Sequence, residues 1–284
     1  MLYLLVVSLL WSFSFVIIKA GLEGLDANVI AAVRLLFSLL VFLPFLRLRG
    51  LTKKDLLQLL ALGAVQFGAM YSLYTACFAY LPAHLIAMFT TTTPLLVVFF
   101  NMLLKGKNVP AFWLAAVLAV IGGLVLRFNR EYADINWHGV LLLQLSNAAF
   151  AIGQLWYKRF AAARKGWQDT RSFAIIYAGG AATCVLMAAG TADWSAVTVI
   201  SLQQWWLLAY LGIVASGLCF FMWNRGATRV NPGMLALMNN LKIPLGVLAP
   251  VLLLQESCNL PAMVLSLLLF MSAFYLCREK SRPA

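Results

Sequence analysis

The chain has 284 residues, of which 63% are hydrophobic and 11% are charged, and its formal net charge is +12. Soluble domains are about half apolar and about a quarter charged, so this composition excludes an ordinary soluble protein and indicates an integral membrane protein. The basic residues are scattered over several short loops, which argues against a nucleic-acid partner and is typical of loops beside a lipid bilayer.

Long apolar segments follow one another along the chain. Each is close to the roughly 20 residues that a helix needs to cross the hydrocarbon layer, and none has the short alternating pattern of a membrane β-barrel. We therefore predict an all-α integral membrane protein with ten transmembrane helices. In chain order, the predicted helices are 2–20, 27–46, 56–80, 83–104, 111–127, 138–157, 171–190, 204–226, 233–254 and 261–277. The first lacks the basic start and cleavage site of a signal peptide, so we expect it to be retained.

The basic residues are divided unequally between the two sides of this arrangement. With the N-terminus in the cytoplasm, 16 of the 21 Lys and Arg residues fall in cytoplasmic loops and tails, and 3 fall outside. This excess follows the positive-inside rule. The distribution predicts that both termini are cytoplasmic and supports an even number of helices.

Matching prolines indicate an internal repeat. When the chain is shifted by 150 residues, Pro82 falls on Pro232 and Pro94 falls on Pro244. Because each half contains five helices, the second half would enter the membrane from the opposite side. Such inverted repeats are typical of secondary transporters, whose solute site lies near the midplane between the repeats. The predicted repeats are residues 1–130 and 131–284.

Lys242 is the most unusual residue of the predicted helix 233–254. A charged side chain at the centre of a membrane helix costs about 2.5–3.5 kcal/mol on insertion scales, so such residues usually face a cavity and have a function. Asn239 and Asn240 precede it, and Pro244 has no N–H to bond the Asn240 carbonyl. We predict that Lys242 binds a carboxylate and that amide or carbonyl oxygens bind an amine. The alternative is a structural lysine that pairs with a carbonyl or extends to the interface.

The predicted helix 83–104 contains the counterpart of this region. Thr92 matches Lys242, and four consecutive threonines precede Pro94. Threonine hydroxyls in membrane helices often bond to their own backbone, so both a solute contact and a structural role are open for Thr92. The matched residues Pro94 and Pro244 predict two kinked helices that could act as hinges.

Other predicted helices carry further polar and aromatic side chains that we expect to contact the solute. They are Trp11 and Ser14 in the first helix, Gln66, Tyr71 and Tyr74 in the third, Asn147 and Gln154 in the sixth, and Asn224 in the eighth. Each could also hold helices together by hydrogen bonds. For Arg34 we favour a structural role, paired with Glu23 or Asp26, over a position at the outer mouth.

The order of these segments resembles the EamA family of the drug/metabolite transporter superfamily over nearly the whole chain. The resemblance rests on the five-plus-five arrangement, on "LLWSFSFVIIKAGL" and "AAVRLLFSLLVFLP" in the first two helices, and on "LLLQES" at the end of the ninth. The resemblance implies transport, often export, of amino acids or related small metabolites across a bacterial inner membrane, and we expect this transport to proceed by alternating access. It also implies a cavity formed chiefly by helices one, three, four, six, eight and nine.

One departure from the family pattern concerns acidic residues. Members often carry Gly-Glu at the ends of helices four and nine, whereas this chain has Lys105-Gly106 and Gln255-Glu256. A role that needs a symmetric pair of carboxylates is therefore in doubt. The interiors of the predicted spans contain no Asp or Glu, so proton coupling, uniport and exchange all stay open.

Two alternatives to transport of a carboxylate-bearing solute are open. The same fold could transport sugars, nucleotide-sugars or drugs. A membrane-embedded lipid-modifying enzyme is less favoured, because it needs clustered catalytic groups and the two histidines, His84 and His138, are far apart in the sequence. The five cysteines have no metal-ligand spacing. We therefore expect no metal, no cofactor and no catalytic residues, and the partners are a small-molecule solute and the lipid bilayer, with the oligomeric state unknown.

Overall fold

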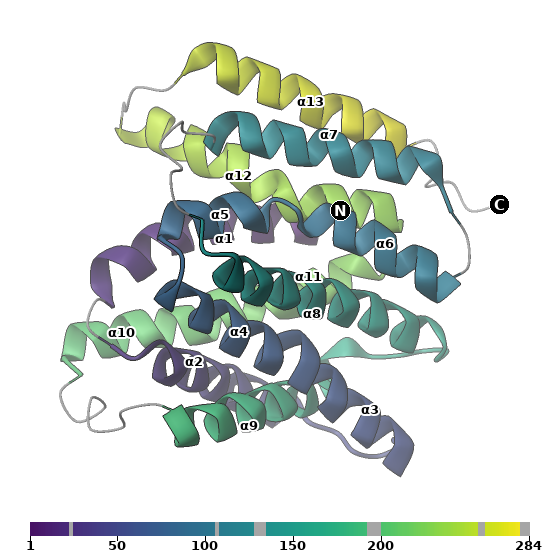
Figure 1. Cartoon of the computed structure of the whole chain (residues 1–284). Coiled ribbons are helices and arrows are strands. Elements are labelled where there is room, and N and C mark those ends of the chain that lie inside the picture. The colour runs from purple at the N-terminus through teal and green to yellow at the C-terminus, as the bar shows by residue number, and fades with distance from the viewer. Residues whose placement is uncertain (23–24, 106–107, 128–134, 192–199, 255–258, 279–284) are drawn as a thin grey trace.

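The computed structural model describes residues 1–22, 25–105, 108–127, 135–191, 200–254 and 259–278, and every regular element within these ranges is a helix (Figure 1). The predicted all-α class is therefore confirmed. The first elements are α1 (Leu2–Gly21) and α2 (Ala27–Phe42), which is followed by the short η1 (Leu43–Phe45). One continuous helical run then contains α3 (Lys53–Gly63), η2 (Ala64–Ala69), α4 (Met70–Ala76) and η3 (Cys77–Ala79). Next come α5 (Ala83–Thr90), α6 (Thr93–Lys105), α7 (Pro110–Arg127) and α8 (Trp137–Ala162). The last are η4 (Asp169–Arg171), α9 (Phe173–Thr191), the contiguous α10 (Leu202–Tyr210), η6 (Leu211–Leu218) and α11 (Cys219–Ala227), α12 (Pro232–Leu254) and α13 (Leu260–Arg278).

Seven helical runs within the described residues are long and apolar enough to cross a membrane. They are Asn28–Phe45, Lys53–Ala79, Leu85–Lys105, Trp137–Ala162, Phe173–Gly190, Leu202–Ala227 and Leu260–Arg278. Two shorter apolar helical stretches, Leu2–Ser12 and Pro110–Leu126, accompany them. The chain is therefore a multi-pass membrane protein.

Polar side chains begin several helices at the expected places. The Asp26 carboxylate accepts hydrogen bonds from the backbone N–H groups of Asn28 and Val29 at the start of α2. Thr52 and Asp55 form a reciprocal capping box at the start of α3. These contacts satisfy backbone donors that have no partner within the first turn of a helix.

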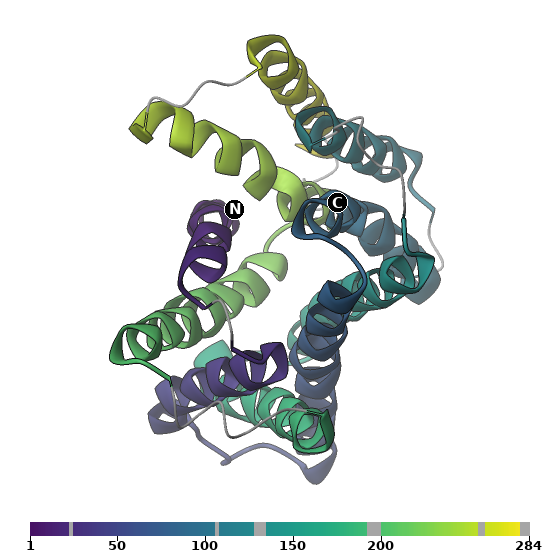
Figure 2. The ribbon, with the colours of Figure 1, turned by 60° about the vertical axis from the view of Figure 1, so that its left-hand side comes forward.

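Close helix pairs form the two edges of the molecule. α2 and α9 pack together at one edge, and α7 and α13 pack together at the other (Figure 1). α3 also packs closely on α9, and a Cβ at Gly63 of α3 would lie only 1.8 Å from the Ile176 carbonyl oxygen of α9. In the middle, α1 and α11 lie on one side and α4 and α8 on the other (Figure 2), and these central helices position the site described next.

The two predicted proline kinks differ in the structure. The predicted helix 83–104 is interrupted between α5 and α6, and Pro94 occupies the first turn of α6, where its missing N–H is tolerated. By contrast, α12 is helical on both sides of Pro244. The interruption thus occurs in one of the two helices, and the hinge role of both prolines stays a prediction.

Candidate functional site

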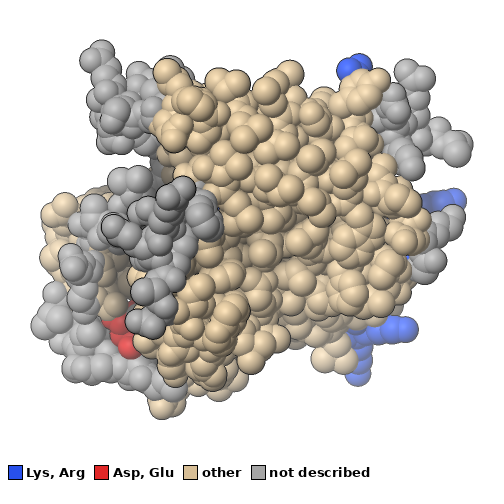
Figure 3. Space-filling view, turned by 45° about the horizontal axis from the view of Figure 1, so that its top comes forward, with Lys and Arg blue, Asp and Glu red and all other residues tan. Residues whose placement is uncertain are grey.

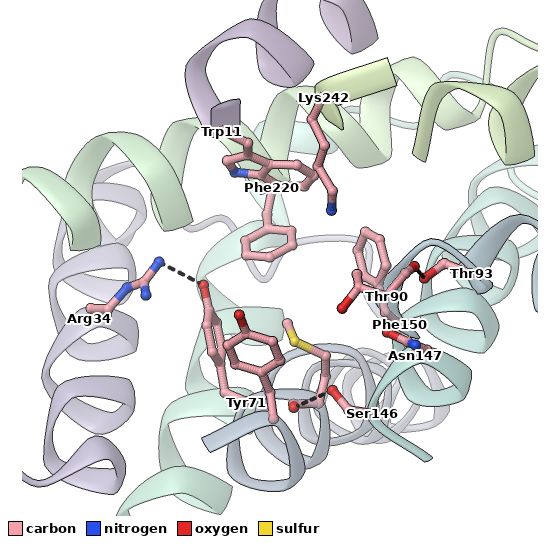
Figure 4. A pocket seen from close by; sticks show the side chains of 12 residues that line it. Trp11, Arg34, Tyr71, Thr90, Thr93, Ser146, Asn147, Phe150, Phe220 and Lys242 are labelled. Atoms are coloured by element: carbon pink, nitrogen blue, oxygen red, sulfur yellow. Dashed lines mark hydrogen bonds between the residues drawn. The ribbon is translucent and has the colours of Figure 1, made fainter. Parts of the chain in front are cut away.

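A cavity of about 140 Å³ lies among the central helices α1, α2, α4, α5, α6, α8, α11 and α12 (Figure 4). Two of its lining residues are the cations Arg34 and Lys242. The others are aromatic, small polar or apolar: Trp11, Met70, Tyr71, Tyr74, Thr90, Thr93, Ser146, Asn147, Phe150 and Phe220. None of the described lining residues is acidic. The cavity wall is therefore positively charged and aromatic.

Lys242 is directed into this cavity from α12. Its Nζ lies 5.5 Å from the centroid of the Trp11 ring, and Figure 4 shows the amine below that ring. The ring is fixed, because Trp11 Nε1 donates a hydrogen bond of 2.8 Å to the Ala215 carbonyl and the centroid of the Phe220 ring lies 5.0 Å away. A cation held over an aromatic face is attracted by the ring and partly removed from water.

Arg34 lies on the opposite side of the cavity, on α2, and is only 8% exposed. Its Nε donates to Ser216 Oγ over 3.2 Å, and its Nη2 donates to Tyr71 Oη over 3.0 Å. The two hydroxyl groups also contact each other at 3.0 Å, and the guanidinium lies 4.9 Å from the centroid of the Tyr71 ring. These contacts hold Arg34 in one orientation.

This position differs from the structural role that we expected for Arg34. Asp26, one of the two predicted ion-pair partners, caps α2, and the ion pairs recorded within the described residues do not include Arg34. Glu23, the other predicted partner, lies outside the described residues. Arg34 is therefore placed in the cavity wall by hydroxyl and aromatic partners.

The interruption between α5 and α6 shapes a third part of the wall. Since Pro94 has no N–H to bond the Thr90 carbonyl, the Thr93 hydroxyl donates to that carbonyl over 2.7 Å. The Thr90 hydroxyl donates to the Ile86 carbonyl over 2.7 Å. From α8, the Asn147 side chain donates to the Phe89 carbonyl over 3.3 Å. The polar groups at this break are therefore bonded, and they give the cavity a wall of hydroxyl and amide groups.

The structure brings together five of the residues predicted to contact the solute. Trp11, Tyr71, Tyr74, Asn147 and Lys242 all line the cavity. The side chain of Ser14 lies outside the described part of the chain. The remaining predicted residues are near the cavity helices but not among its lining residues.

Three of those remaining residues are held by side chains of other helices. The Gln66 and Asn224 amides bond each other reciprocally, over 2.8 Å and 3.0 Å. Gln154 accepts a hydrogen bond of 2.8 Å from Trp223 Nε1. All three side chains are fully buried.

The other three lie on or beside α6 and α12. The Thr92 hydroxyl lies 2.8 Å from two acceptors, the Phe89 carbonyl and Gln144 Oε1, and can donate its hydrogen to either. The Asn239 side chain donates to the Leu235 carbonyl of its own helix over 2.8 Å. The Asn240 side chain donates to the Thr91 carbonyl over 2.7 Å and to the Ala119 carbonyl over 3.2 Å, so it connects α12 to the turn between α5 and α6 and to α7.

Several lining residues were not predicted to be solute contacts. Arg34 could have been found by the argument used for Lys242, because it is also a charge within an apolar segment. Thr90 and Thr93 belong to the threonine run, and Ser146 is adjacent to Asn147. The sequence could not identify the apolar lining residues Met70, Phe150 and Phe220, because an apolar residue that lines a cavity has the same sequence pattern as one in a core.

Comparisons with known proteins identify a family of transporters as the relatives of this chain. The model of the EamA-like transporter family matches residues 1–128 and 137–278. The biotin transporter of Escherichia coli strain K12 is 35% identical over 284 residues, which cover 99% of this chain and 93% of the relative. The probable biotin transporter of Pseudomonas aeruginosa is 35% identical over 267 residues, which cover 93% and 92% of the two chains.

A solved crystal structure shares the fold with a TM-score of 0.76 over 100% of this chain and 98% of its own, at 19% identity. The family match covers most of the chain, and the relatives named above are transporters. The resemblance predicted from the sequence is thus confirmed, and the alternative of an enzyme is set aside. The protein belongs to the EamA-like transporter family and is a multi-pass membrane transporter.

Proposed function

We propose that this protein transports biotin across the bacterial inner membrane by alternating access. The observation that carries the proposal is the cavity, which has Lys242 and Arg34 on opposite sides and aromatic rings between them. Biotin has a carboxylate at the end of an apolar chain and a bicyclic ureido ring at the other end, so its two polar ends match this arrangement. The relatives named biotin transporters, which are 34–35% identical to this chain, support the same solute.

The charge of the lining favours biotin over the amino acids that the family resemblance suggested. An amino acid carries an ammonium group, which is best bound by a carboxylate, and the described lining residues include no Asp or Glu. Biotin has no ammonium group. The same reasoning disfavours cationic drugs. Biotin therefore lies within the predicted class of carboxylate-bearing solutes.

We assign the carboxylate of biotin to Lys242. The amine is directed into the cavity and lies over Trp11, where it is partly removed from water. A carboxylate that reaches it there forms a charge-assisted hydrogen bond, which is stronger than one between neutral groups. Tyr71, Tyr74 and Asn147 line the same cavity and would contact the rest of the solute.

The proposed architecture is ten membrane crossings in two inverted five-helix repeats, residues 1–130 and 131–284. The pairing of α2 with α9 and of α7 with α13 supports it, because each pair joins matching helices of the two repeats. The π-helical stretches η2 and η6, which interrupt the third and eighth predicted helices, are also matched. The two stretches matched by the family model, 1–128 and 137–278, agree with the boundary.

We further propose that both termini are cytoplasmic. In Figure 3, the visible Lys and Arg side chains gather at one end of the molecule and the visible acidic side chain lies at the other end. The positive-inside rule assigns the basic end to the cytoplasm. The hinge role of Pro94 and Pro244 and the export direction stay predictions.

Transport of biotin can be tested with purified protein in liposomes. Liposomes loaded with unlabelled biotin should accumulate external radiolabelled biotin by exchange. At biotin concentrations well below saturation, Lys242→Met should lower the initial rate by roughly 10- to 100-fold, the factor expected for a lost hydrogen bond to a charged group. Lys242→Arg, which keeps the charge, should retain part of the rate.

Arg229→Gln is a suitable control, because this cation lies outside the cavity, 5.2 Å from the Tyr3 ring centroid. Its rate should equal that of the wild type. If folded wild-type protein exchanged biotin no faster than liposomes without protein, the proposed solute would be wrong. Loading biotin on one side only, in oriented vesicles, would separate export from import.

A further inference from the structure

We infer that Arg34 is a specificity-determining residue that binds the ureido carbonyl oxygen of the solute, at the side of the cavity opposite Lys242. This inference rests on the proposed function, because it takes biotin as the solute. It assigns a role to a residue that the sequence alone suggested was structural.

Burial makes Arg34 a residue that needs an acceptor. Its side chain is within a cavity wall and only 8% of the residue is exposed. A buried cation is costly unless its hydrogen-bond donors are satisfied, and an acid usually supplies the counter-charge. Within the described residues its hydrogen-bond partners are two hydroxyl groups, those of Tyr71 and Ser216. A solute acceptor in the cavity would add a third hydrogen bond to the guanidinium group.

The bonding pattern indicates which acceptor suits this site. Nε and Nη2 of Arg34 donate to Ser216 and Tyr71, so the edge of the guanidinium that contains both atoms is occupied. Nη1 donates to none of the described residues. A single oxygen atom, such as that of a cyclic urea, can accept from this nitrogen without disturbing the two hydroxyl contacts. Only a carboxylate bound by two parallel bonds to the Nε–Nη2 edge would have to displace them, and the carboxylate of biotin is assigned to Lys242.

The position of Arg34 provides the second polar contact that biotin needs. Figure 4 shows Arg34 and Lys242 at separate sides of the cavity, with the Phe220 ring between them and the Tyr71 ring beside Arg34. These rings offer apolar surface for the bicyclic ring system and the chain. With the carboxylate at Lys242, the ureido ring is directed to the Arg34 side. Two separated anchors would therefore select a solute that has both groups, over short acids that have only one.

Two analogues of biotin test the two anchors independently. In 2-iminobiotin the ureido oxygen is replaced by a nitrogen that is protonated at neutral pH, so it would bring a positive charge to Arg34. Biotin methyl ester lacks the carboxylate and would affect the contact with Lys242. Binding at neutral pH to purified wild-type protein, measured by calorimetry, should be roughly 10-fold or more weaker for each analogue than for biotin.

Substitutions of Arg34 and of Lys242 should show which of the two residues causes the weaker binding of each analogue. Arg34→Gln should bind biotin roughly 10- to 100-fold more weakly and should lose most of the preference for biotin over 2-iminobiotin. It should keep the preference for biotin over the methyl ester. Lys242→Met should give the opposite pattern, and Arg229→Gln should behave like the wild type on all three ligands.

Because Arg34 is buried, Tyr71→Phe and Ser216→Ala serve as second variants that keep the guanidinium and remove one hydroxyl each. Each of these two variants should lower the preference for biotin over 2-iminobiotin, but by a smaller factor than Arg34→Gln does. If wild-type protein bound 2-iminobiotin as tightly as biotin, or if folded Arg34→Gln kept the full preference, the inference would be overturned while biotin transport stood. If wild-type protein bound no biotin at all, the proposed function itself would fail.

Discussion

At the scale of single residues, the interior depends on polar side chains that satisfy one another. Gln66 of η2 and Asn224 of α11 exchange two hydrogen bonds, of 2.8 Å and 3.0 Å, and both side chains are fully buried. A buried amide without a partner is unfavourable, so the two residues should depend on each other. The pair therefore joins two helices far apart in the sequence, and its role can be tested apart from solute binding.

We predict that Asn224→Leu lowers the thermal stability of the protein in detergent, because it leaves the Gln66 amide buried without its partner. The double variant Gln66→Leu/Asn224→Leu should recover part of the loss. A double-mutant cycle should give a coupling free energy of about 0.6–1.7 kcal/mol, the range found for hydrogen bonds between membrane helices. Where the variants fold, biotin affinity should be nearly unchanged. A loss of affinity without a loss of stability would instead mean that these amides contact the solute.

At the scale of secondary-structure elements, glycines set how closely α3 and α9 approach. A Cβ at Gly63 would lie 1.8 Å from the Ile176 carbonyl oxygen, and one at Gly179 would lie 2.1 Å from the Leu60 carbonyl oxygen. These distances are too short for any side chain, so the two backbones are in direct contact. Small residues at such contacts are common between membrane helices, where close packing replaces much of the hydrophobic driving force.

Gly63→Ala should therefore force α3 and α9 apart and lower the free energy of unfolding by about 1–3 kcal/mol, as overpacking does in other interiors. Gly190→Ala, near the end of α9, is the matched control, because a Cβ there would meet nothing within 4 Å. The control should be neutral or stabilise the helix by up to about 1 kcal/mol. Thermal unfolding in detergent measures both. Equal stability of the two variants would contradict the close approach.

At the scale of the whole molecule, the distribution of charges supports the proposed orientation in the membrane. The visible basic side chains gather at one end of the molecule (Figure 3). Two basic residues that we assign to the cytoplasmic side connect parts of the chain that are far apart in the sequence. Arg164 forms an ion pair with Asp55 of α3. Lys158 Nζ donates to the carbonyls of Ala227 and Val230 over 2.8 Å and 2.5 Å. Basic residues thus connect separate parts of the chain, and by the positive-inside rule they support the proposed orientation.

Reporter fusions would test this orientation. Green fluorescent protein fused after residue 278 should fluoresce, and alkaline phosphatase fused there should be inactive, because that position is assigned to the cytoplasm. Alkaline phosphatase fused after residue 127, at the end of α7, should be active, since five crossings place this point outside. The reverse pattern, or the same result at both positions, would contradict ten crossings with cytoplasmic termini.

Local sequence patterns predicted most of the helices and the charge within α12, but not which polar residues share the cavity. The apolar lengths predicted the helical class, and the cost of burying Lys242 marked it as a cavity residue. Arg34 is also a charge within an apolar segment, but an ion pair with Glu23 or Asp26 was predicted for it. Nor could hydropathy reveal the π-helical stretches η2 and η6, because an apolar π turn and an apolar α turn have the same composition.

The sequence by itself therefore determined that this is an all-helical membrane protein of a transporter family, with a lysine that has to face a polar space. These features follow from composition, segment length and the local order of residues, which do not depend on contacts between distant parts of the chain. Only the tertiary structure decided that Gln66 bonds Asn224 while Asn147 faces the cavity, and that Arg34 lies across from Lys242. The physical reason is that a polar side chain in a membrane helix must be satisfied by something, and its partner comes from a helix far away in the chain, which no local pattern specifies.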